Sequence, residues 1–134
     1  MPFKYRVALQ SDHLLVTLTG DFDITSAMEA TAGGLTECWR YRASEVVVDF
    51  RSLEGSITTS ERYDYASFVS GMMLDHAAKF GRPLRVAFVG SPNLVDPNKF
   101  GETVAVNRGA IVKVTTDMDE GLAWLRKRSE PSES

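Results

Sequence analysis

Apolar and polar residues alternate in two runs at the beginning of the chain. Every second residue is apolar from Phe3 to Leu9 and again from Leu14 to Leu18, with a polar turn at 11–13 between the runs. A period of two is typical of strands with one buried face. The pattern therefore predicts an antiparallel hairpin over 3–19, ended by Gly20.

The period then changes to that of an amphipathic helix, from about Ile24 to Arg40, with Asp23 as its cap. Gly33-Gly34 in its middle marks a weak point or a close helix contact. Three apolar side chains of this helix are expected to pack on the sheet: Met28, Leu35 and Trp39.

Buried strands and further helices follow in alternation. The β-branched run at 45–51 and the apolar run at 84–89 predict two central strands, with a helix over about 59–80 between them that Gly81 and Pro83 end. Asp96-Pro97 predicts a helix over 96–108. A short strand at 111–115 precedes a last helix, whose inward residues include Leu122 and Leu125.

The element order ββαβαβαβα predicts the fold class. Strands that alternate with helices form parallel sheets through right-handed crossovers. We expect one α/β domain over 1–128, with a mixed, mostly parallel five-stranded sheet and four helices, and a polar tail over 129–134.

The chain resembles the SpoIIAA-like, or STAS, domains in this order and in three short motifs. These motifs are Val-Val-Asp-Phe-Arg in the strand at 45–51, Leu-Glu-Gly after it, and Asp-Glu-Gly-Leu-Ala-Trp-Leu at 119–125. The last motif is similar to the bacterial SpoIIAA-like group that is also labelled STAS/SEC14. The resemblance covers roughly residues 3–126 and implies a regulatory protein that binds partners.

In STAS regulators, the loop after the third strand carries Asp-Ser-Ser-Gly, and a partner kinase phosphorylates its serine. Counting without gaps from Asp49 places Ile57-Thr58-Thr59-Ser60 there, so Thr58 keeps the hydroxyl while isoleucine and serine replace the aspartate and the glycine. The resemblance thus implies a phosphoacceptor at Thr58, and most SpoIIAA-like proteins lack the motif as well.

The residues themselves point to the same loop. Thr58 and Glu61 have the spacing of a capping box, and a helix start after a parallel strand is where open α/β folds bind ligands or partners. The hydroxyls that could accept a phosphate or face an anion or partner are those of Ser56, Thr58, Thr59 and Ser60. Four more side chains are candidates to face a ligand or partner: Asp49, Tyr63, Ser91 and Asn93.

No enzyme or cofactor site can be assembled from the sequence. His13 and His76 lie on separate elements, and Cys38 falls on the core face of the first helix, so neither a catalytic nucleophile nor a zinc site is expected. Asp21, Asp23 and Asp49 could converge on a hard cation, but capping already explains Asp23. Neither Gly-x-Gly-x-x-Gly nor Gly-x-x-x-x-Gly-Lys occurs, and no cofactor is predicted.

Composition narrows the class of protein further. A net charge of −3 with interspersed signs gives no reason to expect nucleic acid as a partner. The single cysteine excludes an internal disulfide, and neither a signal peptide nor an apolar run long enough to cross a bilayer is apparent, so a cytoplasmic protein is expected.

We therefore expect a non-enzymatic binding module whose partner is a kinase or another regulator. The alternative is a protein that binds a small molecule, either a lipid or a nucleotide. Such a protein would have a sizeable apolar cavity between the second helix and the sheet. An enzyme is the third class and has the least support.

Overall fold

A computed structural model of the chain describes residues 2–128, so the polar tail at 129–134 lies outside the described part. The strands are β1 (Lys4–Leu9), β2 (Leu14–Asp21), β3 (Glu45–Glu54), β4 (Arg85–Gly90) and β5 (Ile111–Thr115). The helices are α1 (Ile24–Arg40), α2 (Thr59–Phe80), α3 (Phe100–Asn107) and α4 (Met118–Arg128). The element order ββαβαβαβα is confirmed.

The five strands form one sheet in the order β1-β2-β3-β4-β5. β1 pairs antiparallel with β2, and the other three pairs are parallel, as expected. Parallel strands bury both faces, which is why β3 and β4 read as continuous apolar runs. β3 is three residues longer than the predicted range 45–51 and carries the chain to Glu54, at the edge where the loop to α2 begins.

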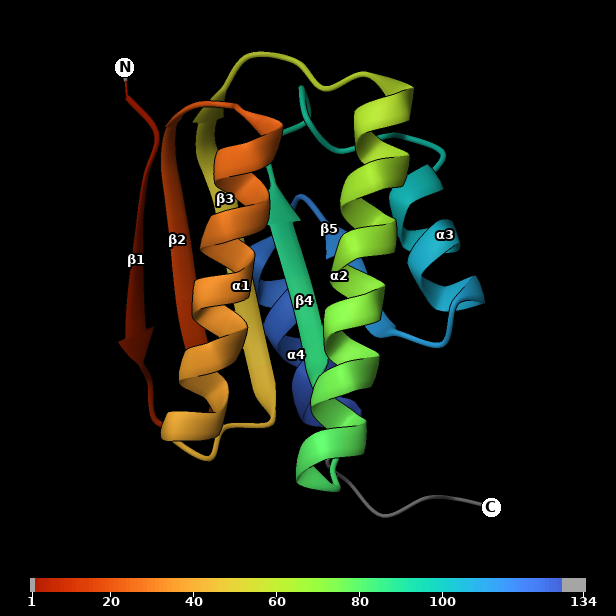
Figure 1. The fold of residues 1–134 in the computed structure, drawn as a ribbon. Coiled ribbons are helices and arrows are strands. Elements are labelled where there is room, and N and C mark those ends of the chain that lie inside the picture. The colour runs from red at the N-terminus through yellow and green to blue at the C-terminus, as the bar shows by residue number, and fades with distance from the viewer. Residues whose placement is uncertain (1, 129–134) are drawn as a thin grey trace.

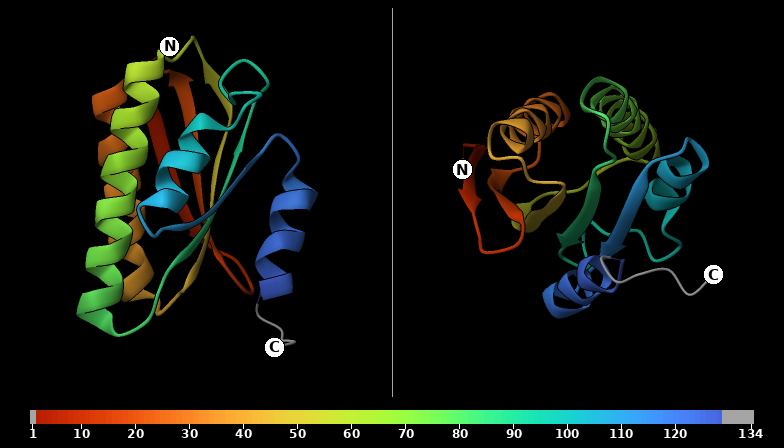
Figure 2. Two further views of the ribbon diagram at one scale, coloured as in Figure 1. Left: turned by 90° about the vertical axis from the view of Figure 1, so that its right-hand side faces the viewer. Right: turned by 90° about the horizontal axis from the view of Figure 1, so that it is seen from below.

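Helices cover the two faces of the sheet unequally. α1, α2 and α3 lie on one face, and α4 lies alone on the other (Figures 1 and 2). Alternate residues of β3 serve the two layers: Val46 and Val48 join the large core under α1 and α2. Val47 instead joins Ala87, Val89 and Leu125 in a small core under α4. Most of the hydrophobic stabilisation therefore lies on the three-helix face.

α1 begins and packs as predicted, except at its end. The Asp23 carboxylate caps it by accepting a hydrogen bond from the Ser26 N–H at 2.9 Å. Gly34 marks a close contact, because a Cβ there would lie 2.7 Å from Val16 Cγ2. Leu35 is buried and Met28 half-buried. The prediction for Trp39 is wrong, since this side chain is 58% exposed.

α2 has both predicted ends, whereas α3 starts later than the sequence indicates. Gly81 closes α2 in the left-handed conformation with φ of 77°. The expected helix over 96–108 begins only at Phe100. The Asp96 carboxylate accepts hydrogen bonds from the N–H groups of Asn98 and Phe100, and so holds a turn that precedes the helix. Lys99, with φ of 55°, then separates this turn from α3.

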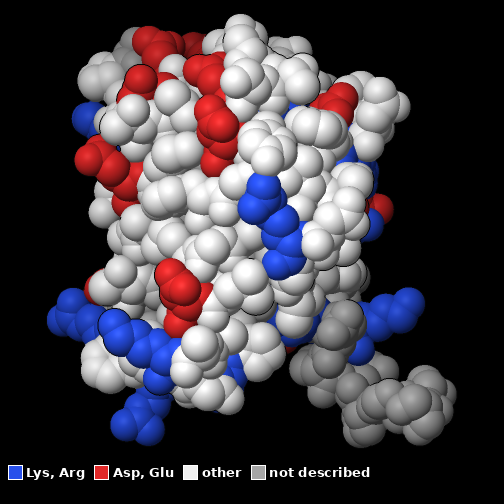
Figure 3. Space-filling model, turned by 45° about the vertical axis from the view of Figure 1, so that its right-hand side comes forward, with Lys and Arg blue, Asp and Glu red and all other residues white. Residues whose placement is uncertain are grey.

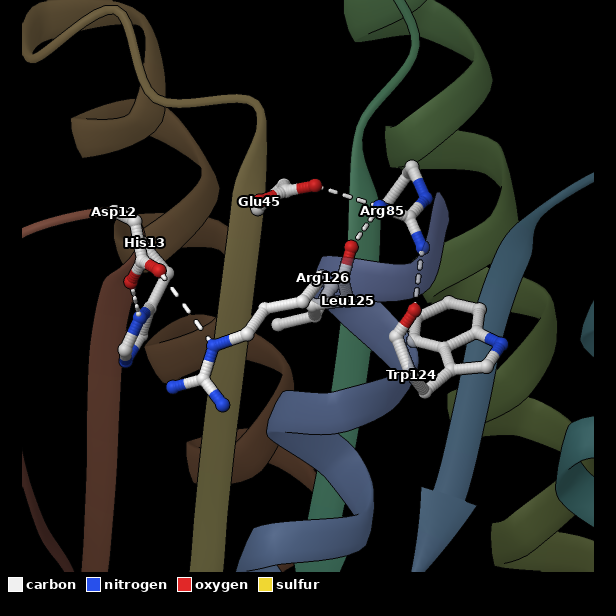
Figure 4. Close-up of polar contacts among 7 residues, drawn as sticks. All are labelled: Asp12, His13, Glu45, Arg85, Trp124, Leu125 and Arg126. Carbon is white, nitrogen blue, oxygen red and sulfur yellow. Dashed lines mark hydrogen bonds and ion pairs between the residues drawn. The ribbon is translucent and has the colours of Figure 1, made fainter. Parts of the chain in front are cut away.

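α4 is fastened to the sheet by an arginine to which the sequence analysis gave no role (Figure 4). Arg85 Nη1 donates to Glu45 Oε2 at 2.6 Å and to the Leu125 carbonyl at 2.8 Å, and Nη2 donates to the Trp124 carbonyl at 3.1 Å. The guanidinium also lies 4.7 Å from the centre of the Trp124 ring. The Leu125 side chain is 2% exposed, which confirms that the last helix closes a part of the core.

Candidate functional site

The carboxyl ends of the parallel strands, together with the loops that follow them, form the strand-end surface, which we define as residues 55–61 and 90–93. Gly55 turns the chain with φ of 108° directly after β3. The four hydroxyl side chains of this loop are all exposed: Ser56, Thr58, Thr59 and Ser60. The half-buried Ile57 packs on the large core and so fixes the loop from below.

Thr58 is the N-cap of α2, and the predicted capping box is present. The Thr58 hydroxyl accepts a hydrogen bond from the Glu61 N–H at 3.0 Å, while the Glu61 carboxylate accepts one from the Thr58 N–H at 2.9 Å. Two of the donors that an anion would use at this helix start are thus already engaged. A phosphate on Thr58 would have to displace the cap and would lie beside the Glu61 carboxylate.

The second segment of the surface follows β4. The Ser91 carbonyl accepts hydrogen bonds from the N–H groups of Leu94 and Val95, each at 3.0 Å, and Asn93 at the turn is exposed. Arg62 of α2 donates from Nη2 to the Leu94 carbonyl at 2.8 Å, which ties the two segments together. The segment that follows β4 therefore lies at the same end of the sheet as the hydroxyl loop (Figure 1), with Asn93 exposed and the Ser91 hydroxyl buried.

Asp49 and Tyr63 lie away from this surface. Asp49 is on the α4 side of β3, two residues after Val47. Its carboxylate accepts from Arg51 Nε at 2.9 Å and from Nη2 at 3.0 Å, and this pairing raises the pKa of the Arg51 guanidinium. Tyr63, 43% exposed, accepts a hydrogen bond from Arg108 Nη2 at 2.7 Å beyond the end of α3.

Carboxylates surround the strand-end surface. Six acidic residues lie on this loop or on the segments adjoining it: Asp21, Asp23, Glu54, Glu61, Asp64 and Asp96. On the face drawn in Figure 3, acidic side chains predominate at the upper end and basic ones at the lower end. Hydrogen bonds from the side chain and the N–H of Ser26 lower the pKa of Asp23, and those from the N–H groups of Phe100 and Asn98 lower the pKa of Asp96. The field at this end thus favours a cationic partner group over an anion.

An apolar cavity of about 100 Å³ lies beneath this surface, between α2, α3 and the sheet. Ile57, Phe88 and Ala105 are among the side chains that line it. Tyr65 also lines it and hydrogen-bonds through its hydroxyl to Thr31 at 2.6 Å, and burial raises the pKa of this phenol to about 12. Side chains of the segment 94–105 form the other wall.

The remaining titratable groups do not assemble into a catalytic arrangement. Cys38 is fully buried, as predicted, and burial raises the pKa of its thiol to about 12. His13 pairs with Asp12 at 2.7 Å in the hairpin turn (Figure 4). Within residues 2–128, no three His, Cys, Asp or Glu side chains come close enough to hold a metal ion. In the same range no helix combines the length and apolarity that crossing a membrane requires.

Similarity to known proteins is found at the level of structure. No family model matches the sequence, and no curated protein is similar to it in sequence. An anti-sigma factor antagonist from Mycobacterium paratuberculosis superposes with a TM-score of 0.56 at 13% identity, over 93% of this chain and 95% of that one. The unphosphorylated anti-sigma factor antagonist SpoIIAA superposes with a TM-score of 0.55 at 14% identity, over 92% and 97%.

A third solved structure is an uncharacterized protein with a SpoIIAA-like fold from Shewanella loihica, with a TM-score of 0.49 at 18% identity over 92% and 93%. The two antagonists match this chain over nearly the full length of both partners. The chain therefore has the SpoIIAA-like fold that the sequence motifs and the element order indicate.

Proposed function

We propose that this protein is a non-enzymatic regulatory module that binds a protein partner through the strand-end surface. The observation that carries this proposal is the exposed hydroxyl loop 56–60, held by a capping box at the end of the longest strand and flanked by carboxylates. Structures with this fold include two anti-sigma factor antagonists, which supports a role in binding regulatory proteins.

The charge of the surface defines the chemistry of the partner. Exposed carboxylates such as Glu54 and Asp64 adjoin the loop, whereas Arg62 beside it is half-buried and bonded to a carbonyl. A partner with a basic contact surface, a kinase or another regulator, would be steered to this end by complementary charge. Phosphorylation of a loop hydroxyl would add about two negative charges and would strengthen that attraction.

Site-specific photo-crosslinking in cells of the source organism tests this function. A photoreactive residue at Thr59, which is exposed and takes no part in the cap, should give one dominant protein adduct. The same residue at Thr36, exposed on α1, is the matched control and should give none. Equal adducts at both positions, or none at Thr59, would refute the strand-end surface as the interface.

Binding of the purified adduct partner then tests the charge argument. Asp64→Lys should weaken binding at least tenfold, and so should an increase in salt from about 0.1 to 1 M, which shortens the screening length from about 10 to 3 Å. Phosphosite mapping of the same cells would show whether Ser56, Thr58, Thr59 or Ser60 is modified. Affinity that is unchanged both by the substitution and by salt would exclude a basic contact surface on the partner.

Binding of a small apolar molecule is a second candidate function, favoured by the cavity between α2, α3 and the sheet. An apolar ligand that fills an apolar cavity stabilises the folded protein. Native mass spectrometry of the protein purified from its own cells should show the added mass of a bound ligand. Ala105→Leu, which fills the cavity, should abolish this added mass. The control Ala123→Leu, on the exposed side of α4, should keep it. An absence of bound mass in the wild type would refute this candidate.

A further inference from the structure

A second pocket, of about 180 Å³, lies at the end of the molecule opposite to the strand-end surface. It is situated between the carboxyl-terminal ends of α1 and α2, which both lie at the lower edge of Figure 1. Its lining includes six side chains that matter for its chemistry: Cys38, Trp39, Arg42, His76, Phe80 and Arg82.

One wall of the pocket is aromatic and faces solvent. The Trp39 indole stacks on the Phe80 ring with 5.1 Å between centroids, and the two side chains are 58% and 37% exposed. The His76 ring lies 4.7 Å from the Phe80 ring. Large rings with one open face are the side chains that most often anchor ligands and partners, because burying them releases much water at little entropic cost.

His76 adds a polar ring to the wall of the pocket. Its side chain is half-buried, and no protein group among the described residues hydrogen-bonds to either ring nitrogen. Burial and the nearby Arg82 charge lower the pKa of His76, so at neutral pH the ring offers one donor and one acceptor.

The charge of the pocket is positive. Arg42 and Arg82 both line it, and the lining found among the described residues contains no carboxylate. The nearest acidic neighbours along the helices are Glu37, which pairs with Arg40 at 3.6 Å, and the exposed Asp75.

The carboxyl-terminal ends of two helices adjoin the pocket, and their carbonyls carry partial negative charge that opposes an anion. Chain N–H groups already bond several of the last helical carbonyls, including those of Cys38, Trp39 and Ala77, which weakens the repulsion that a helix end exerts on an anion. Arg42 has φ of 57°. This left-handed conformation closes α1, because the Arg42 N–H bonds the Trp39 carbonyl and the Ala43 N–H bonds the Cys38 carbonyl in the Schellman pattern of a helix end.

We propose that this pocket binds a small planar anion, an aromatic ring that carries a carboxylate or a phosphate. The ring lies against Trp39, and the anionic group lies between the guanidinium groups of Arg42 and Arg82. The volume exceeds the roughly 150 Å³ that admits benzene in an engineered cavity, so a ring with one substituent fits. This site is separate from the strand-end surface and does not depend on the proposed function.

Tryptophan fluorescence tests the proposal directly. In a Trp124→Phe background, Trp39 is the only indole of the chain and reports on the pocket. Benzoate and phenyl phosphate should each change its emission saturably, whereas benzamide, which has the shape of benzoate without its charge, should bind at least tenfold more weakly. Inorganic phosphate should also bind at least tenfold more weakly than phenyl phosphate, because it lacks the ring.

Two further measurements distinguish this site from nonspecific binding. Arg82→Gln should weaken the binding of benzoate at least tenfold. Arg6→Gln, which removes an exposed arginine from β1, should leave the affinity for benzoate unchanged. The His76 ring signals in NMR should titrate at higher pH when benzoate is bound, because an anion stabilises the charged imidazole. Absence of saturable binding, benzamide binding equal to benzoate, or full affinity in a folded Arg82→Gln variant would each overturn the proposal.

Discussion

Replacing Arg85 with methionine removes the guanidinium that fastens α4 to the sheet (Figure 4). The Arg85 side chain is 11% exposed and bonds to Glu45 of β3 and to two carbonyls near the end of α4. Methionine keeps the apolar contacts of the arginine stem, so the substitution isolates the polar contribution. The carbonyls of Trp124 and Leu125 and the Glu45 carboxylate would then lose this donor.

The expected loss follows from these contacts. A hydrogen bond to a charged group contributes about 1.5–3 kcal/mol. Removal of one partner from a buried ion pair costs about 3–5 kcal/mol, because the remaining charge is left without compensation. The Glu45 side chain is 20% exposed, so water reaches it and reduces the penalty. We expect the free energy of unfolding to fall by about 3 kcal/mol, at the lower end of that range.

Urea denaturation followed by circular dichroism measures this loss, with Arg51→Met as the matched control. Arg51 also pairs with a carboxylate through two nitrogens, but its side chain is 48% exposed, and such pairs contribute less than about 1 kcal/mol. A double-mutant cycle with Glu45→Gln would isolate the ion pair from the two carbonyl bonds. If Arg85→Met were no more destabilising than Arg51→Met, α4 would be held by its apolar face alone and this reasoning would be refuted.

Three further predictions concern stability. Thr58→Ala should lower the free energy of unfolding by about 1 kcal/mol through loss of the cap, and Thr59→Ala should change it by less than about 0.5 kcal/mol; equal effects in denaturant titrations would argue against the capping box. Leu125→Ala should cost about 2–5 kcal/mol and the exposed Leu74→Ala less than about 1 kcal/mol; a small loss at Leu125 in the same titrations would make α4 peripheral. Folding lowers the pKa of His76, so at acid pH the unfolded chain binds a proton that the folded chain does not, and thermal stability should fall as the pH drops below about 6.5. His76→Gln should reduce that fall. An unchanged pH profile in this variant would contradict a contribution from His76.

The sequence predicts the fold well wherever local signals and tertiary packing agree. The β-branched run of β3 is buried on both faces, and the caps Asp23, Thr58 and Gly81 end or begin their helices at the expected residues. Each of these signals depends on neighbouring residues alone: a run of apolar side chains, a short side chain that accepts an N–H, or a backbone free to adopt positive φ. No knowledge of the partner element is needed to interpret them.

The start of α3 could not be predicted because the decisive residue carries no signal. Asp96-Pro97 is typical of a helix start, and Asp96 does accept backbone N–H groups. Lys99 nevertheless takes a left-handed conformation that lysine rarely adopts, which breaks the helix before Phe100. Its ammonium donates to the Val114 carbonyl at 2.8 Å, and Glu102 accepts from the Val114 N–H at 2.6 Å. These long-range bonds to the edge strand β5 compensate for the conformation, and a local pattern does not reveal them.

The error at Trp39 has a physical origin at the ends of α1 and α2. Helical periodicity tells which side of a helix is apolar but not how far the sheet beneath it extends. Trp39 lies one residue before the end of α1, and Phe80 is the last residue of α2. There the two rings pack on each other, and Trp39 keeps much of its surface in water. Local pattern and tertiary structure disagree mostly where a protein serves a function besides folding. The disagreement at Trp39, in a pocket lined by Arg42 and Arg82, makes this end of the molecule, as well as the strand-end surface, a place to test for binding.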